Sequence, residues 1–333
     1  MAIAKTIDTH AHYFPESYID LIREHGKRVG TTVTTDDNGV TFIQVGLHLR
    51  TGPITRLFID LNARIADMDR RGVGMHALSL TQPMVYWAHD ELATQLCVAF
   101  NDSISAAHRA HPDRFIGFAC LPFQNAQLAL EELERAAKLP GVKGVYRATA
   151  VRDKELSDPS FFPVYERIAE LGLPIFLHPV SPVGKERMMK YHLGNFLGNP
   201  YESGIAAASL VFGGVMDAFP KLDVMLPHAG GTFPWLIGRM DHGTTVRAEC
   251  KHMTQPPSAY LRRFHYDTIT HSDKILMNLI DLVGVDRVVM GSDCPADMSY
   301  TRPVDVVERL PDLSSAQREA IVGGNAAKLL RMN

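Results

Sequence analysis

The sequence predicts an α/β chain that folds as a TIM-type barrel of eight strand–helix repeats, (β/α)8. Short apolar runs alternate with amphipathic helical segments along the chain, and this alternation is typical of a parallel sheet. The repeats number about eight, which favours a closed barrel over an open doubly wound sheet. The length of 333 residues suits one barrel. We therefore expect residues 1–333 to form a single domain.

The first repeat carries an insertion. We expect the first strand over Ile7–His12 and a short helix over Ser17–His25. Residues 31–45 then contain two runs rich in threonine, valine and isoleucine on either side of Asn38-Gly39, a dipeptide typical of hairpin turns. These runs predict a small β-hairpin insertion over residues 28–48, which we expect to lie over the mouth of the barrel.

The remaining repeats follow in order, with each strand between helical segments. The expected strands are Gly74–Leu80, Arg114–Cys120, Val142–Tyr146, Ile175–Leu177, Val224–Leu226, Phe264–Thr268 and Val288–Met290. The expected helices are Arg56–Arg71, Asp90–His111, Ala126–Lys138, Pro163–Leu171, Ser203–Phe219, Ser272–Leu282 and Ser314–Leu330. No Gly-x-Gly-x-x-Gly follows the first strand, which disfavours a dinucleotide-binding fold.

Composition and charge indicate an ordinary globular protein that binds a small molecule. The chain is 46% hydrophobic and 21% charged, and its formal net charge is −3. Because no basic run is present, we expect neither a nucleic-acid partner nor a membrane partner. The sequence shows no secretory signal and no apolar stretch near the roughly 18 residues of a membrane span, so we expect a cytoplasmic location. Four widely separated cysteines disfavour a disulfide framework.

Four histidines and one aspartate stand where strands end. His10 and His12 are two apart on the first strand, so their side chains project to the same side. His178, His228 and Asp293 each come directly after or one to two residues beyond an apolar run. A single histidine of this kind is more often structural, but the carboxyl ends of barrel strands meet at one face. Imidazoles and a carboxylate gathered there suit a divalent metal ion.

Short motifs along nearly the whole chain also resemble a known family. They are Asp8-Thr9-His10-Ala11-His12, Ala77-Leu78-Ser79, His111-Pro112-Asp113-Arg114-Phe115, Leu121-Pro122, His178-Pro179, Gly213-Gly214-Val215, Phe219-Pro220-Lys221-Leu222, His228-Ala229-Gly230-Gly231, Gly238-Arg239-Met240 and Gly324-Asn325-Ala326. The chain resembles the amidohydrolase superfamily of metal-dependent barrels. It is most similar to the branch that contains the aminocarboxymuconate-semialdehyde, resorcylate and carboxyvanillate decarboxylases.

The resemblance implies one divalent metal ion, with Zn²⁺ expected and Mn²⁺ as the alternative. The implied ligands are four of the five residues at the strand ends: His10, His12, His178 and Asp293. His228, beside the metal, is implied as the acid and base, so that His228 and Asp293 are the expected catalytic residues. Binuclear members of the superfamily carry a bridging Lys or Glu at the end of strand four. This chain has Val145-Tyr146-Arg147 there, which favours a single ion.

Arginines are the expected partners of a substrate carboxylate. In the aminocarboxymuconate-semialdehyde decarboxylase pattern, one comes from the hairpin after the first strand, but here Ile43 or Gln44 aligns with it. A second, which reaches in from a neighbouring subunit, matches Arg239, so a homodimer is expected. Arg147 and Arg187 are local candidates for the missing arginine. Each of these three could instead be a surface or capping arginine.

Two aromatic residues are further candidates for contact with the substrate. Tyr86 and Trp87 resemble the family's aromatic wall and could stack on a planar substrate, although a core role is equally compatible with the sequence.

We predict a metal-dependent, non-oxidative decarboxylase of a small unsaturated or aromatic carboxylic acid. One alternative is a metal-dependent hydrolase (lactonase or amidohydrolase) or hydratase acting on a similar acid. An alternative of another class is a non-catalytic metal-binding barrel, against which the retention of His228 argues.

Overall fold

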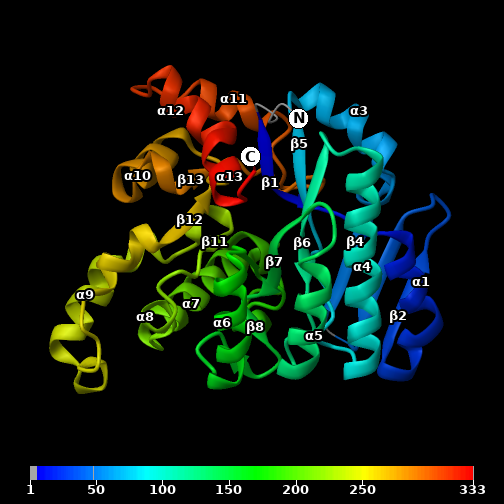
Figure 1. Cartoon of the computed structure of the whole chain (residues 1–333), viewed down its shortest axis with the longest axis horizontal. Helices are drawn as coiled ribbons and strands as arrows, with labels where there is room; N and C mark the ends of the chain where they lie inside the picture. The colour runs from blue at the N-terminus through cyan, green and yellow to red at the C-terminus, as the bar shows by residue number, and fades with distance from the viewer. Residues whose placement is uncertain (1–5, 48, 333) are drawn as a thin grey trace.

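Eight parallel strands form the centre of the computed structural model, which describes residues 6–47 and 49–332 (Figure 1). In sheet order the strands are β1 (Ile7–His12), β5 (Met75–Ser79), β6 (Phe115–Cys120), β7 (Val142–Ala148), β10 (Ile175–His178), β11 (Val224–Leu226), β12 (Phe264–Asp267) and β13 (Val288–Val289). A parallel bridge between Ala11 and Cys294 brings the chain after β13 back to β1. The predicted (β/α)8 barrel is confirmed.

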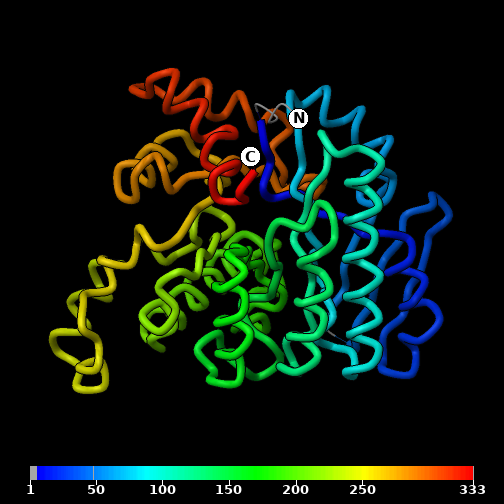
Figure 2. Tube along the Cα trace, in the orientation of Figure 1, coloured from blue at the N-terminus to red at the C-terminus, as the bar shows by residue number. Residues whose placement is uncertain are grey.

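Helices cover the outside of this sheet (Figures 1 and 2). They are α1 (Glu16–His25), α2 (Arg56–Ile59), α3 (Leu61–Arg71), α4 (Asp90–Ala110), α5 (Ala126–Ala136), α6 (Phe162–Leu171), α7 (Asn199–Phe212), α8 (Val215–Ala218), α9 (Ile237–Val246), α10 (Asp273–Val283), α11 (Pro303–Glu308), α12 (Ser315–Glu319) and α13 (Asn325–Leu329). The helix expected over residues 203–219 is interrupted at Gly214, whose φ of 73° is left-handed. Among the described helices, none is both long and apolar enough to cross a membrane.

Local sequence determines where the short helix α3 begins and ends. The Asp60 carboxylate caps its first turn by accepting the backbone N–H groups of Asn62 and Ala63. Gly72, with a φ of 74°, ends the helix in the left-handed conformation that glycine adopts without strain. Between these limits the inner face of the helix buries Arg64 and Met68 against the barrel.

The insertion after β1 is larger than expected. Instead of a hairpin over residues 28–48, the structure has a three-stranded antiparallel sheet of β2 (Thr31–Thr35), β3 (Thr41–Val45) and β4 (Leu49–Ile54). Residue 48 itself lies outside the described part. The third strand was missed because it contains Gly52-Pro53, a pair that sequence patterns associate with turns and that sheets tolerate at edges. The single-domain organisation of residues 1–333 stays a prediction.

Candidate metal centre

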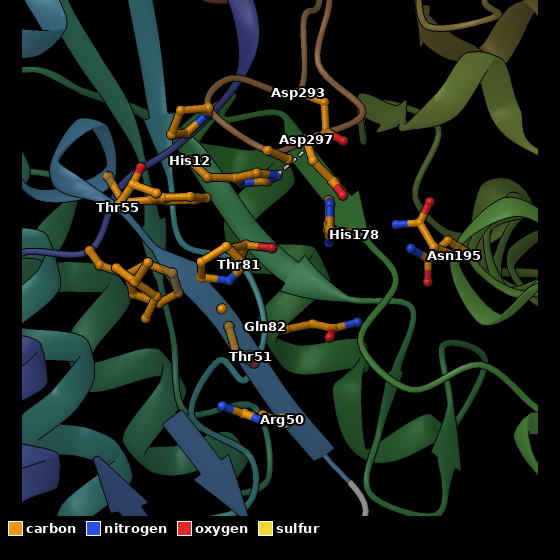
Figure 3. Close-up of a pocket in the computed structure, with 18 of the residues that line it drawn as sticks. His12, Arg50, Thr51, Thr55, Thr81, Gln82, His178, Asn195, Asp293 and Asp297 are labelled. Carbon is orange, nitrogen blue, oxygen red and sulfur yellow. Dashed lines mark hydrogen bonds and ion pairs between the residues drawn. The ribbon is translucent and has the colours of Figure 1, made fainter. Parts of the chain in front are cut away.

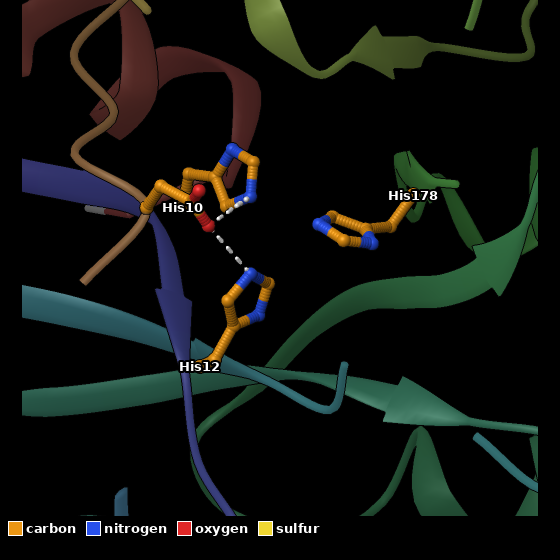
Figure 4. A group of neighbouring side chains, drawn as sticks. His10, His12 and His178 are labelled. Atoms are coloured by element: carbon orange, nitrogen blue, oxygen red, sulfur yellow. Dashed lines mark hydrogen bonds and ion pairs between the residues drawn. The ribbon is translucent and has the colours of Figure 1, made fainter. Parts of the chain in front are cut away.

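Three histidines and one aspartate meet at the carboxyl ends of the barrel strands (Figure 4). His10 and His12 lie on β1, His178 is the last residue of β10, and Asp293 follows β13. One ligand atom from each of these four residues lies within 4.8 Å of the other three, and all four side chains are buried. The structure therefore brings together the four side chains that the resemblance implied as ligands.

Hydrogen bonds turn the three imidazoles so that each presents its Nε2 atom to the cluster. His10 Nδ1 donates to the Asp267 carboxylate at 2.7 Å, and His178 Nδ1 donates to the carbonyl of Pro179 at 2.8 Å. His12 Nδ1 lies 3.2 Å from the Ser79 hydroxyl. Metal binding would require the proton of each ring on Nδ1, because the lone pair of each Nε2 is then available to the metal.

The cluster fits a divalent cation. His10 Nε2 is buried and has no hydrogen-bond partner among the described residues. The Asp293 carboxylate lies 2.9 Å from His12 Nε2 and 3.4 Å from His10 Nε2, so the donor atoms converge on one point. Three imidazole nitrogens and one carboxylate oxygen form a donor set typical of zinc and other first-row divalent ions.

Electrostatics favour most of the protonation states that metal binding requires. Burial lowers the pKa of His12 to about 4 and that of His178 well below its usual value, so both are neutral at pH 7. Burial disfavours the charged Asp293 carboxylate, but the His12 hydrogen bond and the imidazoles outweigh it and hold its pKa below the usual range. His10 differs: burial disfavours its charged form, but the Asp267 hydrogen bond and the charges of nearby carboxylates together outweigh burial and raise its pKa. Metal binding would release a proton there.

His228 lies beside this cluster. Its ring centroid is 5.3 Å from that of His10 and 5.6 Å from that of His178. Its backbone N–H and that of Ala229 donate to the Asp267 carboxylate at 3.0 and 2.8 Å, which holds the turn after β11. Burial, followed by the charge of His10, lowers the pKa of His228. Its Nδ1 is buried without a hydrogen-bond partner in the described part of the chain, so this atom is available for proton transfer.

Asp267 is a functional residue that sequence reasoning missed. It is fully buried, and one carboxylate orients both the ligand His10 and the turn that carries His228. A signal was present, because Asp267 is the last residue of β12, just as His178 is the last residue of β10. The strand was expected to extend to Thr268, so Asp267 was not recognised as a strand-end residue.

A cavity of about 430 Å³ borders the cluster (Figure 3). Four of the residues already described form one side of it: His12, His178, His228 and Asp293. The opposite end is lined by Arg50, with Thr51, Thr81 and Gln82 in between. A second cavity of about 250 Å³ adjoins the first and shares His228 with it.

Arg147 does not reach this cavity. It is fully buried on β7, where its guanidinium lies 4.2 Å from the ring centroid of Phe123 and 4.4 Å from that of Phe161. It also donates to the Tyr165 hydroxyl at 2.5 Å. The reason is the alternation of side chains along a strand. Tyr146 points into the barrel beside His178, so the next residue points toward the surrounding helices.

The other predicted substrate residues are also outside the cavity. Arg187, in a short turn, and Arg239, on α9, are both exposed. Helix α9 extends away from the barrel (Figure 2). Tyr86 and Trp87 line a separate cavity of about 260 Å³, and Trp87 Nε1 donates to the carbonyl of Met84.

Arg50 is an arginine that lines the cavity and that the sequence analysis did not single out. It lies on β4, the strand that was not expected, and it pairs in register with Gln44 on β3. Gln44 is one of the two positions at which the arginine was sought and not found. The guanidinium of Arg50 lies 4.2 Å from the ring centroid of Phe42 and reaches the cavity end opposite the metal cluster.

A barrel that gathers three imidazoles and a carboxylate at its carboxyl face belongs to the class of metal-dependent barrel enzymes. A family model described as amidohydrolase matches residues 7–332. The chain therefore belongs to the amidohydrolase family, as its resemblance predicted.

The similarity to known proteins extends over nearly the whole chain. The 2-amino-3-carboxymuconate-6-semialdehyde decarboxylase of Dictyostelium discoideum is 33% identical, over 98% of this chain and 92% of that protein. The crystal structure of 5-carboxyvanillate decarboxylase from Sphingomonas paucimobilis is 26% identical, with a TM-score of 0.85 and coverage of 98% and 99%. A dihydroxybenzoic acid decarboxylase from Polaromonas sp., with bound manganese and 2-nitroresorcinol, is 25% identical, with a TM-score of 0.81 and coverage of 98% and 97%. The predicted branch is confirmed.

Proposed function

We propose that this chain is a metal-dependent, non-oxidative decarboxylase of a small aromatic or unsaturated carboxylic acid. The observation that carries the proposal is the position of His228, whose ring lies beside the metal ligands and lines the same cavity. The related proteins named above are decarboxylases of acids of this kind, which supports a carboxy-lyase activity.

We propose one divalent ion, held by His10, His12, His178 and Asp293. When bound, such an ion polarises the oxygens of an acid substrate and neutralises part of their charge. Three nitrogen donors favour Zn²⁺, whereas the manganese in the Polaromonas relative supports Mn²⁺. In place of a bridging Lys or Glu, the end of β7 carries Arg147, which points out of the barrel and supports a single ion.

His228 would supply the proton that replaces the carboxylate. The substrate carbon gains this proton, the bond between that carbon and the carboxylate carbon breaks, and carbon dioxide leaves with no net oxidation or reduction. Solvent then returns a proton to the imidazole. The Asp293 and Asp267 carboxylates favour the protonated form of His228 and so counteract part of the effect of burial.

The opposite end of the cavity would orient the substrate. Arg50 offers a guanidinium that can pair with a second acidic group or with a ring oxygen of the substrate. Arg239 is proposed to reach a neighbouring active site in a homodimer. A cytoplasmic location and the absence of nucleic-acid and membrane partners stay predictions from the sequence.

The test combines metal analysis with carbon dioxide release from a panel of hydroxybenzoates and carboxymuconate-type acids. We expect about one metal equivalent per chain and release that His228→Gln reduces by at least about 100-fold, because general acid catalysis contributes that much. The variant should keep its metal, since His228 is not one of the four ligands. Ring-opened or hydrated products without carbon dioxide would favour the hydrolase or hydratase. A metal-loaded chain with no activity on acids, lactones or amides would favour the non-catalytic barrel.

A further inference from the structure

Arg64 lies behind the metal centre and contacts two of the segments that build it. It projects from α3 and is 1% exposed. Its Nη2 donates to the backbone carbonyl of His12 and, at 2.5 Å, to that of Leu57. His12 is a proposed ligand, and Leu57 precedes Phe58, which lines the cavity. One guanidinium thus joins the end of β1 to the cavity wall on α2.

The same arginine also approaches the segment that carries the ligand Asp293. Its Nη1 lies 4.0 Å from the sulfur of Cys294, the next residue in the chain. The carbonyl of Cys294 accepts the backbone N–H of His12 at 2.6 Å. The backbone of His12 is therefore held on both sides, by Cys294 through its N–H and by Arg64 through its carbonyl.

No carboxylate within the described residues forms an ion pair with Arg64. Its Nη1 lies 3.4 Å from His76 Nδ1, and His76 Nε2 lies 3.5 Å from the Asp8 carboxylate. Asp8 in turn accepts the backbone N–H groups of His10 and Ser292, both at 3.0 Å. The buried side chains Arg64, His76 and Asp8 thus form a row that ends on the backbone beside the proposed ligands.

A buried cation without an ion pair is costly, because its hydration is lost without full electrostatic compensation. A leucine or methionine would fill the same space more favourably. What a guanidinium adds is several donors in a fixed plane, so that it can bind carbonyls from two different segments. The two carbonyls that it binds belong to a proposed metal ligand and to a turn of the cavity wall.

We propose that Arg64 is a positioning residue for the metal centre. It fixes the backbone of His12 and thereby the distance between the His12 imidazole and the other ligands. The inference rests on the metal site of the proposed function, but not on the reaction catalysed there. Residues that orient metal ligands typically change metal affinity by about 10- to 100-fold when they are replaced.

The test measures Zn²⁺ and Mn²⁺ affinity of the metal-free protein by competition with a chromophoric chelator. Arg64→Met should raise the metal Kd by about 10- to 100-fold. Arg64→Lys should restore part of the affinity, because an ammonium group can bind one carbonyl but does not offer the planar fork. Arg114→Met is the matched control, since Arg114 also donates to a backbone carbonyl, that of Gly74, which precedes β5 at the opposite end of the barrel.

Thermal unfolding of the same metal-free variants separates positioning from general stability. The inference holds if Arg64→Met binds metal more weakly than the wild type, while Arg114→Met, with a Tm equal to or below that of Arg64→Met, binds metal like the wild type. It is overturned if both variants lose affinity in proportion to Tm, or if Arg64→Met binds metal like the wild type. If Arg64→Met does not fold, Arg64→Lys decides by the same criteria. A wild-type protein that binds neither ion would overturn the metal site itself, and the inference with it.

Discussion

The carboxylate of Asp267 connects two roles within one site. Its Oδ2 accepts hydrogen bonds from His10 Nδ1 and from the backbone of His228, and its Oδ1 accepts those of Ala229 and Ile269. The first contact sets the tautomer of a proposed metal ligand, and the second fixes the turn that carries the proposed acid. A single side chain thus links the proposed metal ligand His10 to the turn that carries the proposed proton donor His228.

His265, two residues earlier on the same strand, makes folding depend on pH. Burial, followed by the charge of Arg287, lowers its pKa to about 4, and its Nδ1 has no hydrogen-bond partner in the described residues. Between pH 6.5 and about 4 the unfolded chain binds a proton that the folded chain does not. The stability of the folded protein should therefore fall by up to roughly 3 kcal/mol as the pH drops through this window.

The measurement is urea unfolding of the metal-free protein between pH 7 and 4, with His265→Leu as the comparison. Other buried histidines contribute to the wild-type slope, so the difference between the two proteins reports His265. The variant should lose less stability on acidification than the wild type. Equal slopes in the two proteins would show that His265 is neutral, or charged, in both the folded and the unfolded states.

Individual residues show which parts of the site could be predicted from the sequence. The convergence of these side chains at one face was predictable, because strand ends converge in a barrel whatever the loops do, whereas the choice of four of them as metal ligands came from the family resemblance. The face on which a side chain lies was not predictable for Arg147, since a shift of one residue along a strand exchanges inside and outside. Tyr146 occupies the inward position, and its neighbour consequently packs between Phe123 and Phe161.

At the scale of elements, the position of β4 determines that Arg50 lines the cavity. β4 is a short edge strand of the insertion. Because it contains Gly52-Pro53, the alternation of apolar and polar residues that predicts strands is absent. Its pairing with β3 carries Arg50 to the cavity. Hairpin turns around Asn38-Gly39 were predictable from local chemistry, but the third strand depends on a tertiary position over the barrel.

Arg50 should therefore affect substrate binding more than folding. We expect Arg50→Met to raise KM by about 10- to 100-fold, the usual effect of losing a hydrogen bond to a charged group, with a smaller change in kcat. Because Arg50 is exposed, Tm should change little. Steady-state kinetics on the best substrate of the panel give both constants.

Arg28→Met is the control for this prediction, because Arg28 is an exposed arginine at the start of the insertion and does not line the cavity. Its kinetic constants should match those of the wild type. A KM that is unchanged in Arg50→Met would remove Arg50 from the substrate site. An equal rise in both variants would point to the overall charge of the insertion instead.

At the scale of the whole molecule, barrel closure assembles the site from the two ends of the chain. His12 and Asp293 form a contact across 281 positions, and Thr9 donates its backbone N–H to the carbonyl of Met290 beside it. The order of the strands made this closure predictable. The shape of the cavity was not, because it comes from the insertion and from the long connection after β10, whose conformations depend on packing.

That connection also carries an apolar surface that one chain leaves uncovered. Exposed apolar side chains are concentrated between β10 and α7, in the first turn of α7 and just before α9: Val183, Met189, Tyr191, Phe196, Leu197, Tyr201, Trp235 and Leu236. Surfaces of this kind commonly mark interfaces in oligomers. Arg239 follows this surface on α9, at the place where a second subunit would meet it. This supports the proposed homodimer in which Arg239 serves the neighbouring active site.

Mixed dimers test this arrangement directly. Arg239→Ala and His228→Ala should each be weakly active alone, the first through lost substrate binding and the second through the lost proton donor. In a mixed dimer one site combines an intact His228 with an intact Arg239 from the other chain. Equal mixing after reversible dissociation should then restore about a quarter of wild-type activity, because half of the dimers are mixed and each has one complete site. Activity that stays at the average of the two variants, or a mass that corresponds to a monomer, would contradict a shared site.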